Sequence, residues 1–212
     1  LFIMSWNLNK MINRNIIAIL RGVKPEEVLE IAQVIVSAGI NKIEVPLNSP
    51  NAYESIKILK SELESSIQIG AGTVTNIKEV EVLVKIGVDF IVSPNFDPSV
   101  VKATKDADII SYPGVTTASE CFSALKCGAD GLKFFPASLL GQENLIALKA
   151  VLPLHVPLYM VGGVGPKNFS TWFDAGAYGF GTGSSLYKAG DSSDVVSKNA
   201  ELIVLSYDEA QK

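Results

Sequence analysis

Short apolar segments alternate with segments of helical periodicity along most of the chain. The apolar segments are rich in Val, Ile and Phe, and they lie at 16–21, 41–47, 67–73, 88–93, 108–113, 130–136, 157–162 and 177–182. The first helix is expected between Pro25 and Gly39, and the others at about 50–64, 76–87, 97–105, 117–127, 143–151, 166–175 and 192–206. Strands that alternate with helices predict a parallel sheet that is buried on both faces.

Eight strand–helix units favour a compact (β/α)8 barrel of the TIM type, and an open doubly wound sheet is the alternative. The chain of 212 residues is shorter than the roughly 250 typical of such barrels, so we expect short loops. No linker or charged block interrupts the pattern, which predicts one domain over residues 1–212. A short helix is expected at 5–14, before the first strand.

The charge and composition exclude several classes of function. Eighteen Lys and Arg against 22 Asp and Glu give a net charge of −4, which argues against a nucleic-acid partner. No apolar stretch has the ~18–20 residues of a membrane span, and the N-terminus does not resemble a secretion signal, so we expect a soluble cytoplasmic protein. The single histidine, His155, and two cysteines, Cys121 and Cys127, argue against a metal site or a disulfide framework.

Lys133 is the most informative polar residue, because it interrupts the apolar strand Gly131–Pro136. A buried ammonium must be paired or lose its proton. Only about one lysine in 2,500 is neutral at pH 7 when the pKa is unperturbed, so a lowered pKa would make this amine a nucleophile for Schiff-base chemistry. A purely structural pairing with a carboxylate is the alternative.

Glu44 lies in a similar setting, between Ile43 and Val45 on the second expected strand. In a barrel its carboxylate can face Lys133 across the mouth and exchange protons as a general acid and base. It can also simply neutralise the lysine, and both roles are compatible because coupled groups titrate together.

Other polar and ring-bearing residues stand where strands end, which is where barrels carry their active sites. Arg21 follows the first strand and is placed to bind a substrate carboxylate, although a surface ion pair is an equal alternative. Thr73 ends the third strand and could donate its hydroxyl to the same carboxylate. Pro94 and Phe135 would form pocket wall, or only pack.

Two glycine-rich turns follow the last two expected strands, Val161–Gly165 and Gly181–Ser185. The corresponding loops of such barrels frequently bind phosphate through backbone N–H groups. We expect Gly162, Gly163 and Gly183 to let the backbone approach the anion and Ser184 to add its hydroxyl, with no Lys or Arg taking part. Tight barrel closure is the alternative explanation for the glycines.

Five motifs distributed along the chain carry a resemblance to a known family. They are Ile-Glu-Val-Pro-Leu-Asn-Ser-Pro at 43–50, Gly-Ala-Gly-Thr-Val at 70–74, Ser-Pro at 93–94, Lys-Phe-Phe-Pro at 133–136 and Gly-Gly at 162–163. In this combination the sequence resembles the class I KDPG/KHG aldolases from about residue 16 to residue 190. The resemblance implies a (β/α)8 barrel, a homotrimer, a Schiff base on Lys133 with Glu44 as proton carrier, and no metal or organic cofactor. It also implies small-molecule partners, namely a phosphorylated 2-keto-3-deoxy sugar acid and the products pyruvate and glyceraldehyde 3-phosphate.

Three positions make the sequence most similar to the branch that acts on 2-dehydro-3-deoxy-6-phosphogalactonate. Pro46, Asn48 and Val161 stand where the gluconate-type enzymes usually carry Thr, Arg and Thr, and the stretch 186–190 is also of the galactonate type. Without Arg at position 48, we expect Arg21 and Thr73 to bind the substrate carboxylate, and Val161 to line the pocket.

Alternative functions share much of this site. The same chemistry could act on 2-dehydro-3-deoxy-6-phosphogluconate or on 4-hydroxy-2-oxoglutarate. A sugar-phosphate epimerase or isomerase would use Glu44 as base and Lys133 as an electrostatic partner. A non-catalytic phosphosugar-binding barrel would not need a buried nucleophile, so Lys133, Glu44 and Thr73 together argue against it.

Overall fold

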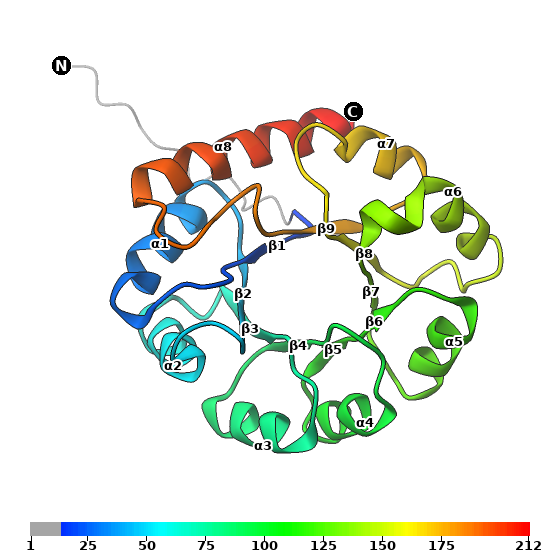
Figure 1. Ribbon diagram of the computed structural model, residues 1–212, viewed down its shortest axis with the longest axis horizontal. Helices are drawn as coiled ribbons and strands as arrows, with labels where there is room; N and C mark the ends of the chain where they lie inside the picture. Colours follow the sequence, from blue (N-terminus) through cyan, green and yellow to red (C-terminus); the bar gives the residue numbers. More distant parts are fainter. Residues whose placement is uncertain (1–13) are drawn as a thin grey trace.

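The computed structural model describes residues 14–212, and nearly all of the short helix expected at 5–14 therefore lies outside the described residues. The elements are β1 (Ile16–Ile19), α1 (Pro25–Ser37), β2 (Lys42–Pro46), α2 (Ala52–Glu62), β3 (Gln68–Gly72), α3 (Ile77–Ile86), β4 (Phe90–Val92), α4 (Pro98–Asp106), β5 (Ile110–Tyr112), β6 (Gly114–Val115), α5 (Ala118–Lys126), β7 (Leu132–Phe134), α6 (Ala137–Lys149), β8 (Leu158–Val161), α7 (Phe169–Asp174), β9 (Gly179–Thr182) and α8 (Ser193–Ala210). Figure 1 shows the strands as an inner ring surrounded by the helices, which confirms the predicted barrel. No helix in residues 14–212 is both long enough and apolar enough to cross a membrane.

The ring is made of parallel strands in the order β5-β4-β3-β2-β1-β9-β8-β7-β6. The single strand expected at 108–113 is instead divided at Pro113, because proline has no N–H to donate to a neighbouring strand. The part before Pro113 pairs with β4, and the part after it pairs with β7. The carbonyl of Pro113 still accepts a hydrogen bond from the N–H of Lys133 at 2.9 Å, so the ring continues across the division.

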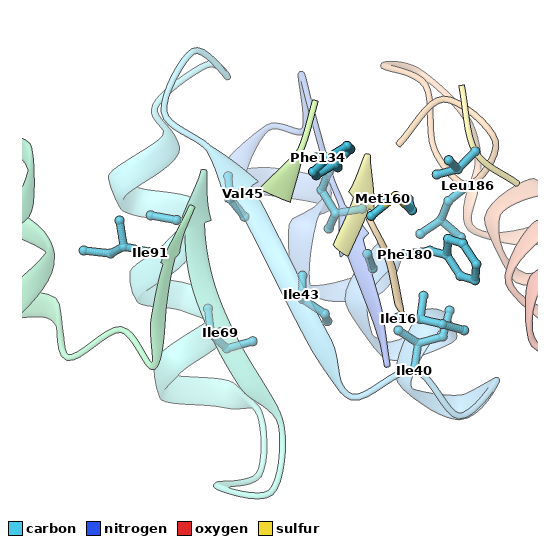
Figure 2. Close-up of a cluster of buried hydrophobic side chains, with 14 of the residues drawn as sticks. Ile16, Ile40, Ile43, Val45, Ile69, Ile91, Phe134, Met160, Phe180 and Leu186 are labelled. Carbon is cyan, nitrogen blue, oxygen red and sulfur yellow. The ribbon is translucent and has the colours of Figure 1, made fainter. Parts of the chain in front are cut away.

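Side chains on β1, β4 and β8 alternate between two hydrophobic cores. On β1, Ile16 and Ala18 belong to the large core between strands and helices, whereas Ile17 and Ile19 belong to the smaller core inside the ring. Figure 2 shows part of the large core, where side chains from several strands pack together. Polar residues that share the inward direction of Ile17 and Ile19 are therefore held inside the ring.

One helix begins earlier than its pattern predicts. The sequence pattern places the sixth helix at 143–151, but α6 begins at Ala137 and contains a break at Gly141, with φ 75° and ψ 162°. Glycine adopts such angles readily, and the residues before it form a separate first turn. The expected range therefore corresponds to the part of α6 after the break.

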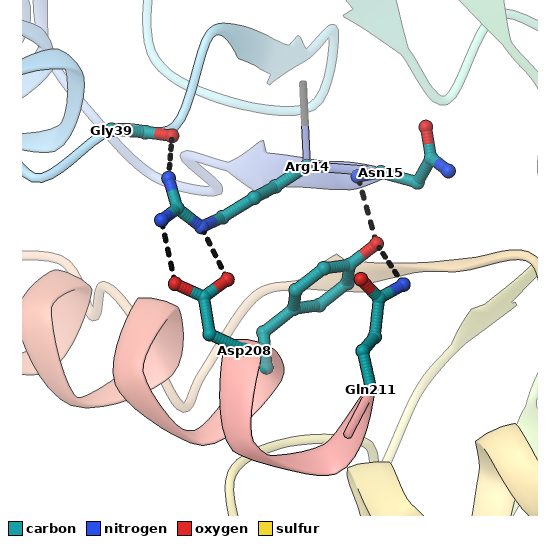
Figure 3. A network of polar contacts seen from close by, with 6 residues as sticks. Arg14, Asn15, Gly39, Asp208 and Gln211 are labelled. Carbon is teal, nitrogen blue, oxygen red and sulfur yellow. Dashed lines mark hydrogen bonds and ion pairs between the residues drawn. The ribbon is translucent and has the colours of Figure 1, made fainter. Parts of the chain in front are cut away.

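A network at the amino-terminal ends of the strands fastens the last helix to the first strand (Figure 3). The guanidinium of Arg14 donates two hydrogen bonds to the carboxylate of Asp208 on α8, at 2.7 and 2.6 Å, and a third to the carbonyl of Gly39 at 3.3 Å. The phenol oxygen of Tyr207 accepts the N–H of Asn15 at 3.0 Å. These contacts hold the two ends of the described chain together.

Candidate active site

Glu44 points into the ring from the middle of β2. Its neighbours Ile43 and Val45 belong to the outer core, so the strand's alternation turns the carboxylate inward, where the residue is only 2% exposed. Gly72 on the adjacent strand β3 makes room for this carboxylate, because a Cβ at position 72 would overlap it. A glycine of the Gly-Ala-Gly-Thr-Val motif at 70–74 therefore makes space for the carboxylate of Glu44.

Lys133 occupies the corresponding inward position on β7. Leu132 and Phe134 on either side belong to the outer core, and Lys133 is 4% exposed. Its Nζ lies 4.7 Å from the centre of the ring of Phe135, an arrangement in which the aromatic face attracts an ammonium. Burial against an aromatic ring leaves the amine few ways to be solvated.

Burial shifts the pKa of both groups toward their neutral forms. The pKa of Glu44 is raised, chiefly by desolvation, while the positive charges of Lys133 and Arg21 oppose that rise. The pKa of Lys133 is lowered, chiefly by desolvation, which the charge of Glu44 opposes and that of Arg21 reinforces. None of the ion pairs within residues 14–212 joins Glu44 to Lys133. The pair can therefore offer a neutral amine and an exchangeable carboxyl proton to a molecule between them.

A cavity of about 340 Å³ opens at the carboxyl-terminal ends of the strands. Its lining includes seven of the residues that the sequence selects for binding, namely Arg21, Phe135, Val161, Gly162, Gly163, Gly183 and Ser184. Gly162 and Gly163 have φ of 91° and 76°, in the left-handed region that glycine adopts without strain. Because Phe135 lines the cavity and also contacts Lys133, the cavity adjoins the buried lysine.

Known proteins are similar to this chain in sequence and in fold. The model of the KDPG and KHG aldolase family matches residues 8–200. The chain belongs to the KDPG and KHG aldolase family. It is 41% identical over 195 residues to 2-dehydro-3-deoxy-6-phosphogalactonate aldolase of Escherichia coli (strain K12), covering 92% of this chain and 95% of that protein. It is 42% identical over 195 residues to a probable enzyme of the same name in Rhizobium meliloti (strain 1021), covering 92% of each chain. A solved structure described as native KDPGal superposes with a TM-score of 0.91 at 41% identity, covering 92% of this chain and 95% of that one.

Two of the binding residues selected from the aldolase sequence lie outside the cavity lining. Thr73 directly follows β3 and is half-buried, with φ of 58°, a left-handed angle that a β-branched residue rarely adopts. Pro94 follows β4, and its backbone carbonyl lies against Gly114, which has no side chain to prevent the approach. Both residues are at the carboxyl-terminal ends of their strands, so they border the same mouth of the aldolase barrel.

The structure gives position 48 a contact that sequence reasoning missed. From the sequence, Asn48 is notable only because the family resemblance leads us to expect arginine at this position. In the structure its side-chain Oδ1 accepts a hydrogen bond from Nη1 of Arg21 at 2.7 Å. Asn48 therefore holds Arg21 at the mouth of the barrel.

Tyr187 and Lys188 also line the cavity, and neither was selected from the sequence as a binding residue. A lysine therefore stands in the cavity lining beyond the glycine-rich turn 181–185, and the expectation that the two turns bind an anion without Lys or Arg stays a prediction. The sequence pointed to these two residues in part. They lie four and five positions after Gly183, within the stretch 186–190 that resembles the galactonate-type enzymes. What the sequence lacks is the direction of each side chain, which depends on how the loop folds.

Proposed function

We propose that this aldolase cleaves 2-dehydro-3-deoxy-6-phosphogalactonate to pyruvate and glyceraldehyde 3-phosphate through a Schiff base on Lys133. The observation that carries the proposal is the burial of Lys133 inside the ring, with its pKa lowered by desolvation, beside Glu44 and a cavity at the strand ends. The substrate class is further supported by the relatives of 41% and 42% identity, both of which are named for the galactonate compound.

The reaction begins when the neutral amine of Lys133 attacks the C2 ketone and forms a carbinolamine. Glu44 donates its proton to the departing hydroxyl, so that loss of water gives a protonated imine and leaves Glu44 as a carboxylate. The protonated imine draws electrons from the neighbouring carbon. Glu44, directly or through a water molecule, takes the proton of the C4 hydroxyl as the C3–C4 bond breaks, and the bond's electron pair moves into an enamine. The aldehyde fragment is glyceraldehyde 3-phosphate. The enamine takes a proton at C3, and hydrolysis of the imine releases pyruvate and restores the lysine.

The cavity lining suits a molecule with an anion at each end. Arg21, with Thr73, would bind the carboxylate next to the ketone. Gly162, Gly163 and the neighbouring Gly183–Ser184 turn would bind the phosphate. Phe135 and Val161, which line the cavity, would form the apolar wall between these ends, and Pro94, outside that lining, would border the mouth. Val161, unlike the threonine usual in the gluconate-type enzymes, places no hydroxyl beside the glycine turn. We assign the preference for the galactonate epimer to Val161 together with Pro46 and Asn48.

The test is turnover of the two C4 epimers side by side, measured as pyruvate release with lactate dehydrogenase. We expect the galactonate epimer to react at least as fast as the gluconate epimer. A strong preference for the gluconate epimer would retain the aldolase and reject the substrate.

Borohydride trapping with pyruvate tests the Schiff base separately. Wild type should gain the mass of a reduced pyruvate adduct, and Lys133→Ala should gain none while keeping its circular dichroism. Turnover without any adduct would support the epimerase or isomerase alternative. Trapping that persists in Lys133→Ala would place the Schiff base on another residue.

We also propose that residues 1–212 act as one aldolase domain and that three copies assemble into a homotrimer, as the family resemblance implies. Support comes from apolar side chains that are exposed on α6 and the loop after it, namely Leu139, Ile146, Val151 and Leu154. Sedimentation velocity should give the mass of three chains, and a monomer at micromolar concentration would reject the assembly.

A further inference from the structure

Two cations give the cavity lining its charge among residues 14–212. Arg21 and Lys188 are the charged residues in its lining, and no Asp or Glu of residues 14–212 lines it. Arg21 is held by Asn48, as described above. Lys188, by contrast, takes part in none of the ion pairs within the described part of the chain. The cavity lining therefore includes an exposed lysine whose charge is not neutralised by any ion pair within residues 14–212.

The backbone that carries Lys188 is fixed on both sides. Before it, Leu186 and Tyr187 are 0% and 2% exposed, and their N–H groups donate to the carbonyl of Gly183 at 2.8 and 3.0 Å. The hydroxyl of Tyr187 also donates to the carboxylate of Glu27 on α1 at 2.9 Å. The position from which the Lys188 side chain extends is therefore set by the loop and by α1.

Contacts after Lys188 complete this support. The N–H of Lys188 donates to the side-chain carboxylate of Asp191 at 2.9 Å, and the N–H of Asp191 donates back to the carbonyl of Lys188 at 2.9 Å. The Asp191 carboxylate is thus bonded to the backbone, not to the ammonium. Only the flexible side chain of Lys188 needs to be ordered when an anion binds.

The place of Lys188 in the fold indicates which end of the substrate it could bind. It follows Ser184 by four residues, in the same loop after β9 as Gly183, and the cavity also includes Gly162 and Gly163 of the preceding loop. Arg21 follows β1 and is tied to Asn48 on the loop after β2. We propose that Lys188 binds the phosphate monoester end of the substrate and makes recognition depend on that phosphate. The inference rests on the proposed function and adds a specificity-determining residue to it.

A comparison of two substrates tests this role. Lys188→Met should lower kcat/KM for the phosphorylated 2-keto-3-deoxy acid by roughly tenfold to a hundredfold, as expected for loss of a charge-assisted contact to a phosphate. The same variant should change kcat/KM for the unphosphorylated acid by less than about twofold. That substrate has no phosphate, so neither wild type nor Lys188→Met can make the contact between residue 188 and a phosphate. Lys188→Arg should restore most of the loss, since it keeps the charge.

Lys167→Met is the matched control. Lys167 is exposed on the loop after β8, at the same end of the barrel, but it does not line the cavity. The Lys167→Met variant loses the same charge as Lys188→Met. Equal losses of kcat/KM for the phosphorylated acid in both variants would therefore assign the effect to net charge and overturn the proposal. A similar loss on both substrates in Lys188→Met, or no loss on either, would also overturn it.

Two further measurements separate this inference from the proposed function. Borohydride trapping with pyruvate, which has no phosphate, reports whether Lys133 forms its Schiff base in each variant. Titration with inorganic phosphate, followed by calorimetry without any substrate, should give a dissociation constant at least tenfold higher in Lys188→Met than in wild type. Failed trapping in wild type would reject the Schiff base, whereas unchanged phosphate affinity in Lys188→Met would reject the role of Lys188.

Discussion

Two charged residues act on the pKa of Lys133 in opposite directions. The negative charge of Glu44 raises it and the positive charge of Arg21 lowers it, while burial lowers it most. Schiff-base formation needs the neutral amine, so the rate of trapping with pyruvate should rise with pH through this pKa. Glu44→Gln should move that rise to lower pH and Arg21→Met to higher pH. Mass spectrometry of the borohydride-reduced adduct over a pH series measures both.

Lys42→Met provides the control for this experiment. Lys42 is a second lysine with a pKa lowered by burial, and its Nζ lies 3.4 Å from the hydroxyl of Tyr159. It stands at the amino-terminal end of β2, away from the cavity. In this variant the rate of trapping should rise with pH over the same range as in wild type. Shifts of the same sign in Glu44→Gln and Arg21→Met would contradict the assignment of Lys133 as the nucleophile.

Asn48 is expected to act through Arg21. Because the two share one hydrogen bond of 2.7 Å, Asn48→Ala should lower kcat/KM for the sugar acid roughly fivefold, which corresponds to about 1 kcal/mol. The loss should appear mainly in KM, and Asn48→Asp, which keeps the acceptor, should recover it. A double-mutant cycle with Arg21→Met gives the decisive measurement, since full additivity would mean that the two residues act independently.

The residues of the site differ in how visible they are in the sequence. Lys133 and Glu44 could be predicted because a charged residue inside an apolar strand needs a partner or a function. Asn48 and Lys188 could not, because polar residues on loops are common and their roles depend on contacts between loops that are distant in sequence. Arg21 stands between these cases, since its position at a strand end was informative but its partner was not.

At the scale of elements, the alternating pattern predicted the order of strands and helices well. The pattern did not predict the two places where a single proline or glycine interrupts a strand or a helix. Pro113 divides the fifth strand, so that its halves pair with different neighbours, and Gly141 divides α6. Periodicity gives the type of an element, whereas pairing and interruption depend on the three-dimensional neighbours.

The carboxylate of Glu120 caps the amino-terminal end of helix α5. The carboxylate of Glu120 accepts the N–H groups of Thr116 and Thr117, both at 2.9 Å. These bonds, chiefly the one from Thr116, lower the pKa of Glu120. Glu120→Ala should therefore reduce the free energy of unfolding at pH 7 by about 0.5–1 kcal/mol, a value kept small by solvent screening. Urea unfolding measures the difference.

The same variant has a defined pH dependence. A carboxyl with a lowered folded-state pKa stabilises the fold above its unfolded-state pKa. That contribution should disappear as the pH falls from the ordinary glutamate value of 4.5 through the lowered value, so wild type and Glu120→Ala should converge in acid. Glu81→Ala, which removes an exposed carboxylate from α3, should change stability by less than about 0.5 kcal/mol at either pH. A difference that grows in acid would contradict the capping role.

Across the whole molecule, the chemistry and the closure of the chain lie at opposite ends of the barrel. The cavity is at the carboxyl-terminal ends of the strands, whereas Arg14 and Asp208 meet beside the beginning of β1 (Figure 3). Barrels commonly separate stability from activity in this way. Substitutions at the closing network should therefore change stability and leave catalysis intact.

Asp208→Asn tests this separation. It keeps the shape of the side chain but removes the charge that accepts two hydrogen bonds from Arg14, and loss of this partly buried ion pair should cost about 1 kcal/mol. For a chain of this size that loss lowers Tm by roughly 2–4 °C. Glu209→Gln removes an exposed charge one residue further along α8 and should leave Tm nearly unchanged. Because the substrate would bind at the far end, kcat/KM below Tm should equal that of wild type in both variants. A reduced kcat/KM in Asp208→Asn would mean that the two ends are coupled through α8 and β1, since those elements connect the network to Arg21.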